Sequence, residues 1–160
     1  MFVVFKFKKG FGMVEVLVGA SIISLTLMGL VSLGQNYLKI SNRNNEALQA
    51  TFLLEESLEA VRLLRDDDWD VNIATLSSET DYFIIFNGSQ FEATTTYGLI
   101  DGLFERKIVV SDVFRDPNDI IVPVGTLDDG IKKITAQVSW NSPSGTTTKS
   151  ISTYLADIAN

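Results

Sequence analysis

The sequence predicts an α+β protein, in which a long N-terminal helix packs by its second half on a C-terminal antiparallel β-sheet. Residues 11–33 are apolar almost without interruption, and residues 34–66 carry apolar side chains at helical spacing with no proline. From Tyr82 onward, apolar residues alternate with polar ones as they do in half-buried strands. These patterns divide the chain into four segments: residues 1–10, 11–33, 34–66 and 67–160.

Residues 11–33 are long enough to cross a membrane. At the helical rise they reach about 35 Å, against a hydrocarbon core of about 30 Å. Lys6, Lys8 and Lys9 precede this segment, and no acid occurs before Glu15. By the positive-inside rule we expect a single-pass protein of the cytoplasmic membrane, with its N-terminus in the cytoplasm and everything after residue 33 outside.

A cleaved secretory signal is the alternative interpretation of this segment, because Ser32-Leu33-Gly34 offers small residues for cleavage. The apolar run is longer than the roughly 7–15 residues of a signal core, and Glu15 interrupts it. Both features favour a membrane-spanning helix.

Glu15 is an acid within an apolar membrane segment. Such a residue costs about 2.5–3.5 kcal/mol on insertion scales and is retained mainly for function, so it predicts a partner. If the chain were cut after Gly10, the new α-amino group of Phe11 would carry a positive charge at the same depth. The amine of an adjacent, identically oriented copy is better placed for this pairing than the amine of the same helix.

Residues 8–18 (KKGFGMVEVLV) resemble the prepilin signature of type IV pilins and type II secretion pseudopilins. The resemblance implies that a membrane-embedded prepilin peptidase cuts between Gly10 and Phe11, removes residues 1–10 as a leader, and methylates Phe11. It assigns Glu15 to subunit registration in a helical filament. Residues 11–33 would then first anchor the precursor and later form the assembly half of the helix.

The same resemblance implies a pilin-like fold, and the closing hairpin and residues 58–62 (LEAVR) are similar to those of minor pilins and minor pseudopilins. The implied partners are prepilin peptidase, other pilin or pseudopilin subunits, an inner-membrane assembly platform and membrane lipid. The implied location is the bacterial cytoplasmic membrane, followed by a filament at the membrane or cell surface.

Composition bounds the chemistry of the exterior segment. The 160 residues include no cysteine and no histidine, so thiol nucleophiles, disulfides, the usual general base and the commonest zinc ligand are missing. We therefore expect no catalytic residue, no cofactor and no metal ion. Removing the three lysines of residues 1–10 changes the net charge from −7 to −10. Such an acidic chain does not favour phosphate backbones, and we expect no nucleic-acid partner.

The exterior half of the helix carries one apolar stripe, whose part from Leu48 to Leu64 is expected to cover the sheet. Its members are Tyr37, Ile40, Ala47, Leu48, Thr51, Leu54, Leu58, Val61 and Leu64. The acidic run at residues 66–70 ends the helix, because acids at a helix C-terminus oppose the macrodipole. We interpret this run, residues 116–119 and residues 128–130 as solvated turns rather than calcium sites, because they lack the spacing of an EF-hand loop.

The predicted strands follow the turn signals. Residues 82–86 and 90–97 form a hairpin around Asn87-Gly88-Ser89, and residues 106–114 form a long strand. Residues 131–140 and 146–155 form the closing hairpin, with Ile134, Ala136, Val138 and Trp140 on the buried face. Six aromatic residues of this region could form a ligand-binding surface, but at strand spacing most of them are assigned to the core: Phe83, Phe86, Phe91, Tyr97, Phe104 and Phe114. The threonine runs at residues 94–96 and 146–148 suit exposed strand edges.

Two classes of function remain after these exclusions. The first is a structural, minor subunit of a type IV pilus or type II secretion pseudopilus, polymerised through its N-terminal helix. The second is a bitopic membrane protein whose exterior β-rich domain binds a ligand or partner. The sequence does not separate pilus from pseudopilus, a major from a minor subunit, or adhesion from motility, DNA uptake or secretion.

Overall fold

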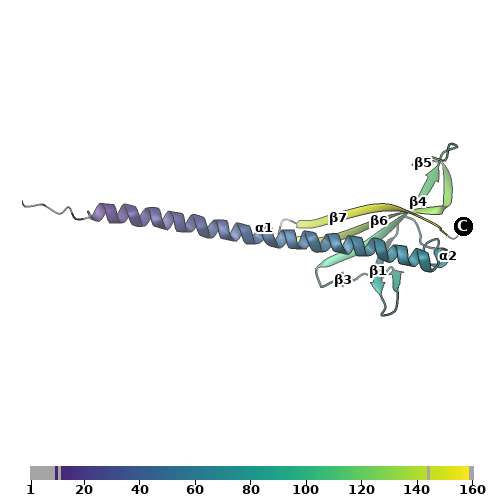
Figure 1. Cartoon of the computed structure of the whole chain (residues 1–160), viewed down its shortest axis with the longest axis horizontal. Coiled ribbons are helices and arrows are strands. Elements are labelled where there is room, and N and C mark those ends of the chain that lie inside the picture. The colour runs from purple at the N-terminus through teal and green to yellow at the C-terminus, as the bar shows by residue number, and fades with distance from the viewer. Residues whose placement is uncertain (1–9, 11, 144, 159–160) are drawn as a thin grey trace, which may run out of the picture. The chain divides into compact units, whose positions relative to one another are not determined.

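The computed structural model describes residues 10, 12–143 and 145–158 (Figure 1). One long helix, α1 (Met13–Asp67), precedes a short helix, α2 (Trp69–Asn72), and seven strands. All strand pairs are antiparallel, which confirms the predicted α+β class. The chain divides into two compact units between Asn44 and Asn45, and α1 contributes to both.

Five strands form the main sheet of the second unit, in the order β2-β1-β4-β6-β7, and β3 and β5 each pair with β4. Their bounds are β1 Asp81–Phe86, β2 Phe91–Thr94, β3 Leu99–Ile100, β4 Phe104–Arg115, β5 Ile121–Val122, β6 Thr126–Ser142 and β7 Gly145–Ala156. Both predicted hairpins are confirmed: Phe86 pairs with Phe91 across the first turn, and Ser142 pairs with Gly145 across the second. The threonine run at residues 146–148 lies in the edge strand β7, whereas of the run at residues 94–96 only Thr94 belongs to the edge strand β2 and the other two follow it.

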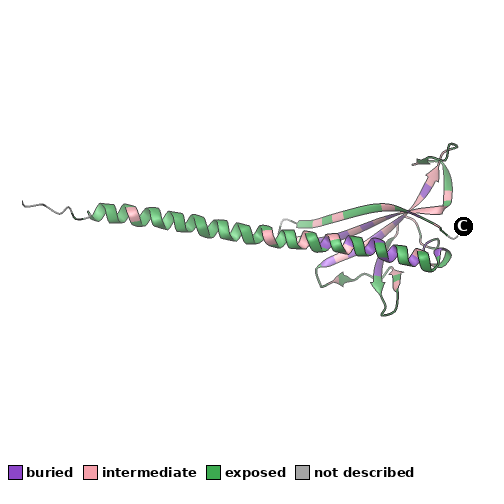
Figure 2. Cartoon of the chain, in the orientation of Figure 1, coloured by how far each residue is buried: buried purple, intermediate pink, exposed green. Residues whose placement is uncertain are grey.

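The core of this unit lies between the second half of α1 and one face of the sheet (Figure 2). The alternation predicted for β6 is confirmed, since Ile134, Ala136, Val138 and Trp140 are all buried. On α1 the buried residues are Ala50, Leu54, Ser57, Leu58, Ala60, Val61 and Leu64.

The predicted stripe on α1 is therefore correct from Leu54 to Leu64 and wrong at Leu48, which is 55% exposed. Ala50 takes the buried place at this end of the stripe. The physical reason is the helical period. At 3.6 residues per turn, a residue two positions before Ala50 lies on the opposite side of the helix.

The acidic run at residues 66–70 does more than end α1. Asp68 caps the short helix α2, because its Oδ1 accepts a hydrogen bond from the amide of Val71 at 2.9 Å. Trp69 is buried against the core. The sequence-based interpretation of the run as a solvated turn is therefore wrong for Trp69, whereas Asp68 is exposed between the two helices.

Residues 128–130 lie inside β6 and not in the predicted turn. Their pairing with β4 is interrupted by a register shift between Asp112 and Val113, so the Asp-Gly sequence belongs to a bulge in a continuing strand. The assignment of most of the six aromatic residues to the core is confirmed: Phe83 and Phe104 are buried, and Phe91 and Phe114 are half-buried. Phe86 and Tyr97 are the exceptions, each 59% exposed.

Candidate functional site

The N-terminal end of α1 is held by a reciprocal pair of hydrogen bonds. The backbone N–H of Glu15 donates to the carbonyl oxygen of Gly12 at 3.0 Å, and the N–H of Gly12 donates to Glu15 Oε2 at 3.0 Å. This is the glutamate half of a capping box, in which the third helical residue reaches back to the residue before the helix. The negative carboxylate also lies at the positive end of the helix dipole.

Sequence reasoning missed this intrachain partner of Glu15. A glycine followed three residues later by a glutamate, at the start of an apolar helix, is the signal that indicates it. Gly10 is exposed and precedes the helix. Phe11 lies outside the described residues. The predicted cleavage between them, the methylation of Phe11 and the pairing of Glu15 with a neighbouring amine therefore stay predictions.

The first half of α1 is long and apolar enough to cross a membrane, by length and composition. None of its most apolar window is buried within the chain (Figure 2). The core helix of a soluble protein would be mostly buried, and this window is not. Large apolar side chains are exposed on every side of it: Val14, Val16, Leu17, Val18, Ile22, Ile23, Leu25, Leu27, Met28, Leu30, Val31 and Leu33.

Hydroxyl groups within this apolar stretch bond back to the helix. Ser21 Oγ donates to the carbonyl oxygen of Leu17 at 2.8 Å, and Ser24 Oγ donates to that of Ala20 at 2.8 Å. Thr26 Oγ1 donates in the same way to the preceding turn. Such bonds satisfy polar groups without water, which a hydrocarbon environment requires.

In the second unit, polar side chains join α1 to the sheet. Lys149 Nζ, on the edge strand β7, donates to the carbonyl oxygen of Ala47 and to Thr51 Oγ1, each at 3.0 Å. Arg106, on β4 and 7% exposed, donates from Nη2 to the carbonyl oxygen of Ile84 at 2.9 Å. Its Nη1 lies 2.9 Å from Glu56 Oε1 on α1. These contacts supplement the apolar core and fix α1 on one face of the sheet.

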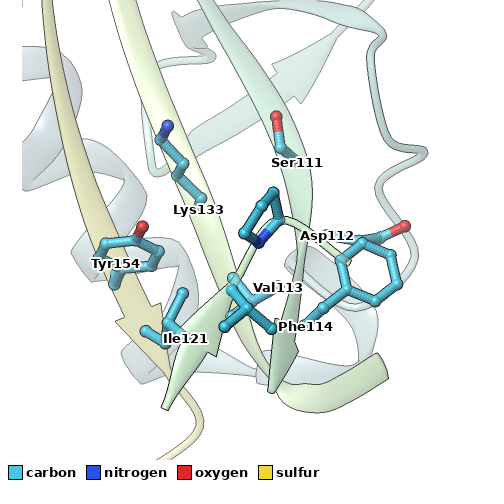
Figure 3. Close-up of a pocket in the computed structure, with 9 residues that line it drawn as sticks. Ser111, Asp112, Val113, Phe114, Ile121, Lys133 and Tyr154 are labelled. Atoms are coloured by element: carbon cyan, nitrogen blue, oxygen red, sulfur yellow. The ribbon is translucent and has the colours of Figure 1, made fainter. Parts of the chain in front are cut away.

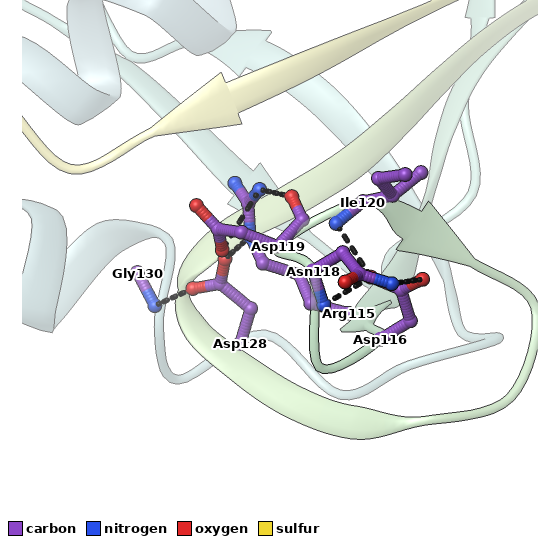
Figure 4. Close-up of polar contacts among 7 residues, drawn as sticks. All are labelled: Arg115, Asp116, Asn118, Asp119, Ile120, Asp128 and Gly130. Carbon is purple, nitrogen blue, oxygen red and sulfur yellow. Dashed lines mark hydrogen bonds and ion pairs between the residues drawn. The ribbon is translucent and has the colours of Figure 1, made fainter.

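The far end of β4 carries a projecting segment, residues 115–128, which we call the arm; it contains β5 and leads into β6. Arg115 Nε forms an ion pair with Asp128 Oδ2 at 2.5 Å, and Arg115 Nη1 donates to the carbonyl oxygen of Asp119 at 2.7 Å (Figure 4). The hydrogen bond to Asp128 is the largest cause that raises the pKa of Arg115.

The tip of the arm is an Asx-type turn. Asp116 Oδ1 accepts hydrogen bonds from the amides of Asn118 and Ile120, each at 2.9 Å. These bonds, the one from Ile120 first, lower the pKa of Asp116. The turn predicted at residues 116–119 is confirmed, and this carboxylate is used by its own backbone.

A groove of about 380 Å³ lies beside the arm (Figure 3). It is lined by Ser111, Asp112, Val113, Phe114, Ile121, Val122, Pro123, Lys133 and Tyr154. Asp112 pairs with Lys132 Nζ at 2.6 Å, and this hydrogen bond is the main cause that lowers the pKa of Asp112. Within the described residues, no cluster of three or more acidic side chains is arranged to hold a metal ion.

The chain matches no protein-family model, no curated protein and no solved structure. Function must therefore be argued from the residues and their geometry.

Proposed function

We propose that the chain is a structural, minor subunit of a type IV pilus or type II secretion pseudopilus, without catalytic activity of its own. The observation that carries the proposal is an apolar helix of membrane-spanning length that begins at Met13, is capped by Glu15, and has none of its most apolar window buried within the chain. The signature at residues 8–18 supports it.

In this proposal α1 acts twice. As a precursor, the chain spans the cytoplasmic membrane once, with residues 1–10 in the cytoplasm and the β-rich unit outside. Prepilin peptidase then cleaves between Gly10 and Phe11 and methylates Phe11. The same apolar surface that contacted lipid next packs against the helices of neighbouring subunits in the filament, with help from the assembly platform. The exchange is possible because lipid tails and apolar side chains offer similar surroundings.

Glu15 would gain a second partner during this step. In the single chain its carboxylate accepts a hydrogen bond from the amide of Gly12. A carboxylate has two oxygens and can accept further bonds, so it can hold this cap and still attract a positive charge. The methylated amine of Phe11 in an adjacent subunit is the charge we propose.

The experiment is mass spectrometry of the protein isolated from the membrane of its native host. We expect a mature chain that begins at Phe11 and carries an N-terminal methyl group. Exchange of Gly10 for alanine should test the cleavage rule, because the uncut precursor should accumulate. A native protein that retains Met1 would refute the proposal, and a chain that begins after Gly34 would instead identify a secretory signal.

The second candidate is a bitopic membrane protein whose exterior unit binds a partner. The groove of about 380 Å³ beside the arm favours it, because its volume lies within the range of ligand sites. The same mass measurement separates the two candidates, since a permanently anchored protein keeps residues 1–10.

A further inference from the structure

The arm, which follows the C-terminal end of β4, exposes aliphatic side chains. Val124 is 86% exposed and Ile120 is 60% exposed. Ile121 and Leu127 are also exposed, so four aliphatic side chains face solvent within eight consecutive residues. Single exposed apolar residues are ordinary, but a contiguous group on a projecting segment marks an interaction surface.

The arm is held in one conformation by its own contacts. Arg115 ties its base to Asp128 at 2.5 Å, and Asp116 caps the turn that precedes Ile120 (Figure 4). Phe114 pairs with Val122 in the β4–β5 ladder. Because this surface is ordered before any partner arrives, docking on it loses little conformational entropy.

The groove provides a recess next to these exposed side chains. Ile121 and Pro123 of the arm, Phe114 of β4 and Tyr154 of β7 supply apolar walls (Figure 3). A recess of about 380 Å³ has room for an aliphatic side chain of a partner. Lys133 also lines the groove. No described carboxylate forms an ion pair with Lys133.

The charges on the arm indicate which kind of partner can bind there. The arm, residues 115–128, contains one arginine against three aspartates, a net charge of −2, and the acidic Asp129 follows it. Two arms from two copies would repel each other. A second apolar recess, lined in part by Leu63 and Phe86, is bordered by Asp66 and Asp67, so an arm docked there would meet like charge as well. A second copy of the chain is therefore disfavoured on both surfaces.

We propose that the arm and its groove form a docking surface for a different protein, one that presents aliphatic side chains flanked by lysine or arginine. The aliphatic side chains pack on Ile120 and Val124 and enter the groove. The basic residues of the partner lie over Asp119 and Asp129, away from Lys133. This inference is independent of the proposed function, because it holds for a filament subunit and for a permanently anchored protein.

The test uses the full chain in phosphatidylcholine nanodiscs and a synthetic peptide with a Val-Ile centre between lysine pairs, with binding followed by calorimetry. The doubly changed variant Ile120→Ser/Val124→Ser should lose about tenfold or more in affinity, because the apolar contact is removed. Val71→Ser is the matched control, since Val71 is exposed but lies in α2. It should bind like the unchanged chain, and empty nanodiscs should not bind.

Charge variants test the orientation. Asp129→Asn should weaken binding and reduce its dependence on salt, whereas Lys133→Glu should strengthen it. A peptide with glutamate in place of lysine should not bind. The proposal is overturned if no saturable binding occurs, or if the serine variant binds as well as the unchanged chain. It is also overturned if sedimentation shows self-association that the serine variant abolishes, because a second copy then covers the arm.

Discussion

Trp140 Nε1 on β6 donates a hydrogen bond to Glu46 Oε2 on α1 at 3.1 Å. The indole is buried, with only 5% exposure, and Glu46 supplies the hydrogen-bond acceptor for its N–H. The two residues lie 94 positions apart in sequence. This single bond therefore couples the helix to the closing hairpin of the same unit.

Exchange of Glu46 for alanine should lower the free energy of unfolding of the exterior unit by about 1–3 kcal/mol, because the indole N–H is left unsatisfied. Glu46→Gln keeps an acceptor oxygen and should cost clearly less. Urea unfolding of the full chain in micelles, followed by far-ultraviolet circular dichroism, measures both. Glu55→Ala, at an exposed position of the same helix, is the control. Equal losses for alanine at positions 46 and 55 would refute a role for the hydrogen bond.

Arg106 provides a second test of the contact between α1 and the sheet. Its guanidinium is buried, but Nε and Nη1 have no hydrogen-bond partner among the described residues, although Nη1 lies close to Glu56. Removing Glu56 should cost about 1–3 kcal/mol, because it leaves a buried charge with one hydrogen bond. Arg106→Met removes that charge and fills the same space, so it should be nearly neutral.

The same unfolding measurement compares these two variants. If Arg106→Met is much less stable than Glu56→Ala, the contacts of the arginine side chain stabilise this part of the structure. Neutralisation of its charge by Glu56 is then the smaller contribution. The double variant Arg106→Met/Glu56→Ala should then match the methionine variant if the two residues interact chiefly with each other.

Periodic apolar residues made the sheet predictable from sequence. Ile134, Ala136 and Val138 alternate strictly, and the turn residues on either side fix where the strands end. The stripe on α1 was predictable for the same reason, except near Leu48. There, apolar character alone does not tell which side of a continuous helix faces the sheet.

Residues whose place depends on distant partners were not predictable. Arg106 is polar yet buried, because its partners, the carbonyl oxygen of Ile84 and the carboxylate of Glu56, lie far from it in sequence. The Asp-Gly pair at residues 129–130 is a turn signal locally, but β4 continues alongside and keeps it in β6. At the N-terminus, sequence identified Glu15 as significant but not its bond to Gly12.

Gly125 is required by the close approach of the arm to β4. A Cβ at this position would lie 2.9 Å from the carbonyl carbon of Arg115 and 3.0 Å from Val122 Cγ2. Gly125→Ala should therefore open the β4–β5 pairing, with a local cost of about 1–3 kcal/mol. Hydrogen exchange of residues 115–125, measured by mass spectrometry, should become faster.

The matched control is Gly130→Ala, where the nearest atom to the added Cβ is 3.5 Å away, an ordinary contact. In Gly130→Ala the hydrogen exchange of residues 115–125 should stay unchanged. Equal exchange in both alanine variants would contradict the close approach. Because the arm carries the proposed docking surface, Gly125→Ala should also weaken binding of the lysine-flanked peptide.

The lowered pKa of Asp116 predicts how the arm responds to acid. Its pKa in the folded chain is lowered from 3.8, first by the amide of Ile120 and then by Asn118. A lowered folded pKa means that the ionised carboxylate stabilises the arm above the unfolded pKa of about 4. This stabilisation is lost as the pH falls through the folded value, so the arm should loosen only in strong acid.

Nuclear magnetic resonance of the Asp116 carboxyl carbon measures this titration directly. We expect a midpoint below 3.8 and a parallel change in the amide shift of Ile120. In Asp116→Asn the pH dependence of the Ile120 amide should disappear. A carboxyl that titrates at or above its ordinary value would show that the hydrogen bonds of the turn do not persist in solution.

Glu15 has two roles that two substitutions can separate. Glu15→Ala removes both the cap on Gly12 and the negative charge, while Glu15→Gln keeps an oxygen that can accept from the Gly12 amide. If the carboxylate pairs with the methylated amine of a neighbouring subunit, both variants should be cleaved after Gly10 and both should fail to enter filaments. The measurements are N-terminal mass spectrometry and blotting of the sheared filament fraction.

If capping alone matters, Glu15→Gln should assemble nearly as well as the unchanged chain, because the start of α1 is preserved. Gly19→Ala is a suitable control in the same helix, since an added Cβ there meets no atom within 4 Å. Normal incorporation of Glu15→Ala would exclude both roles. If Glu15→Gln is cleaved normally but does not enter filaments, the negative charge is what assembly requires. The neutral glutamine still accepts the hydrogen bond from Gly12, but it does not attract an amine in an apolar environment.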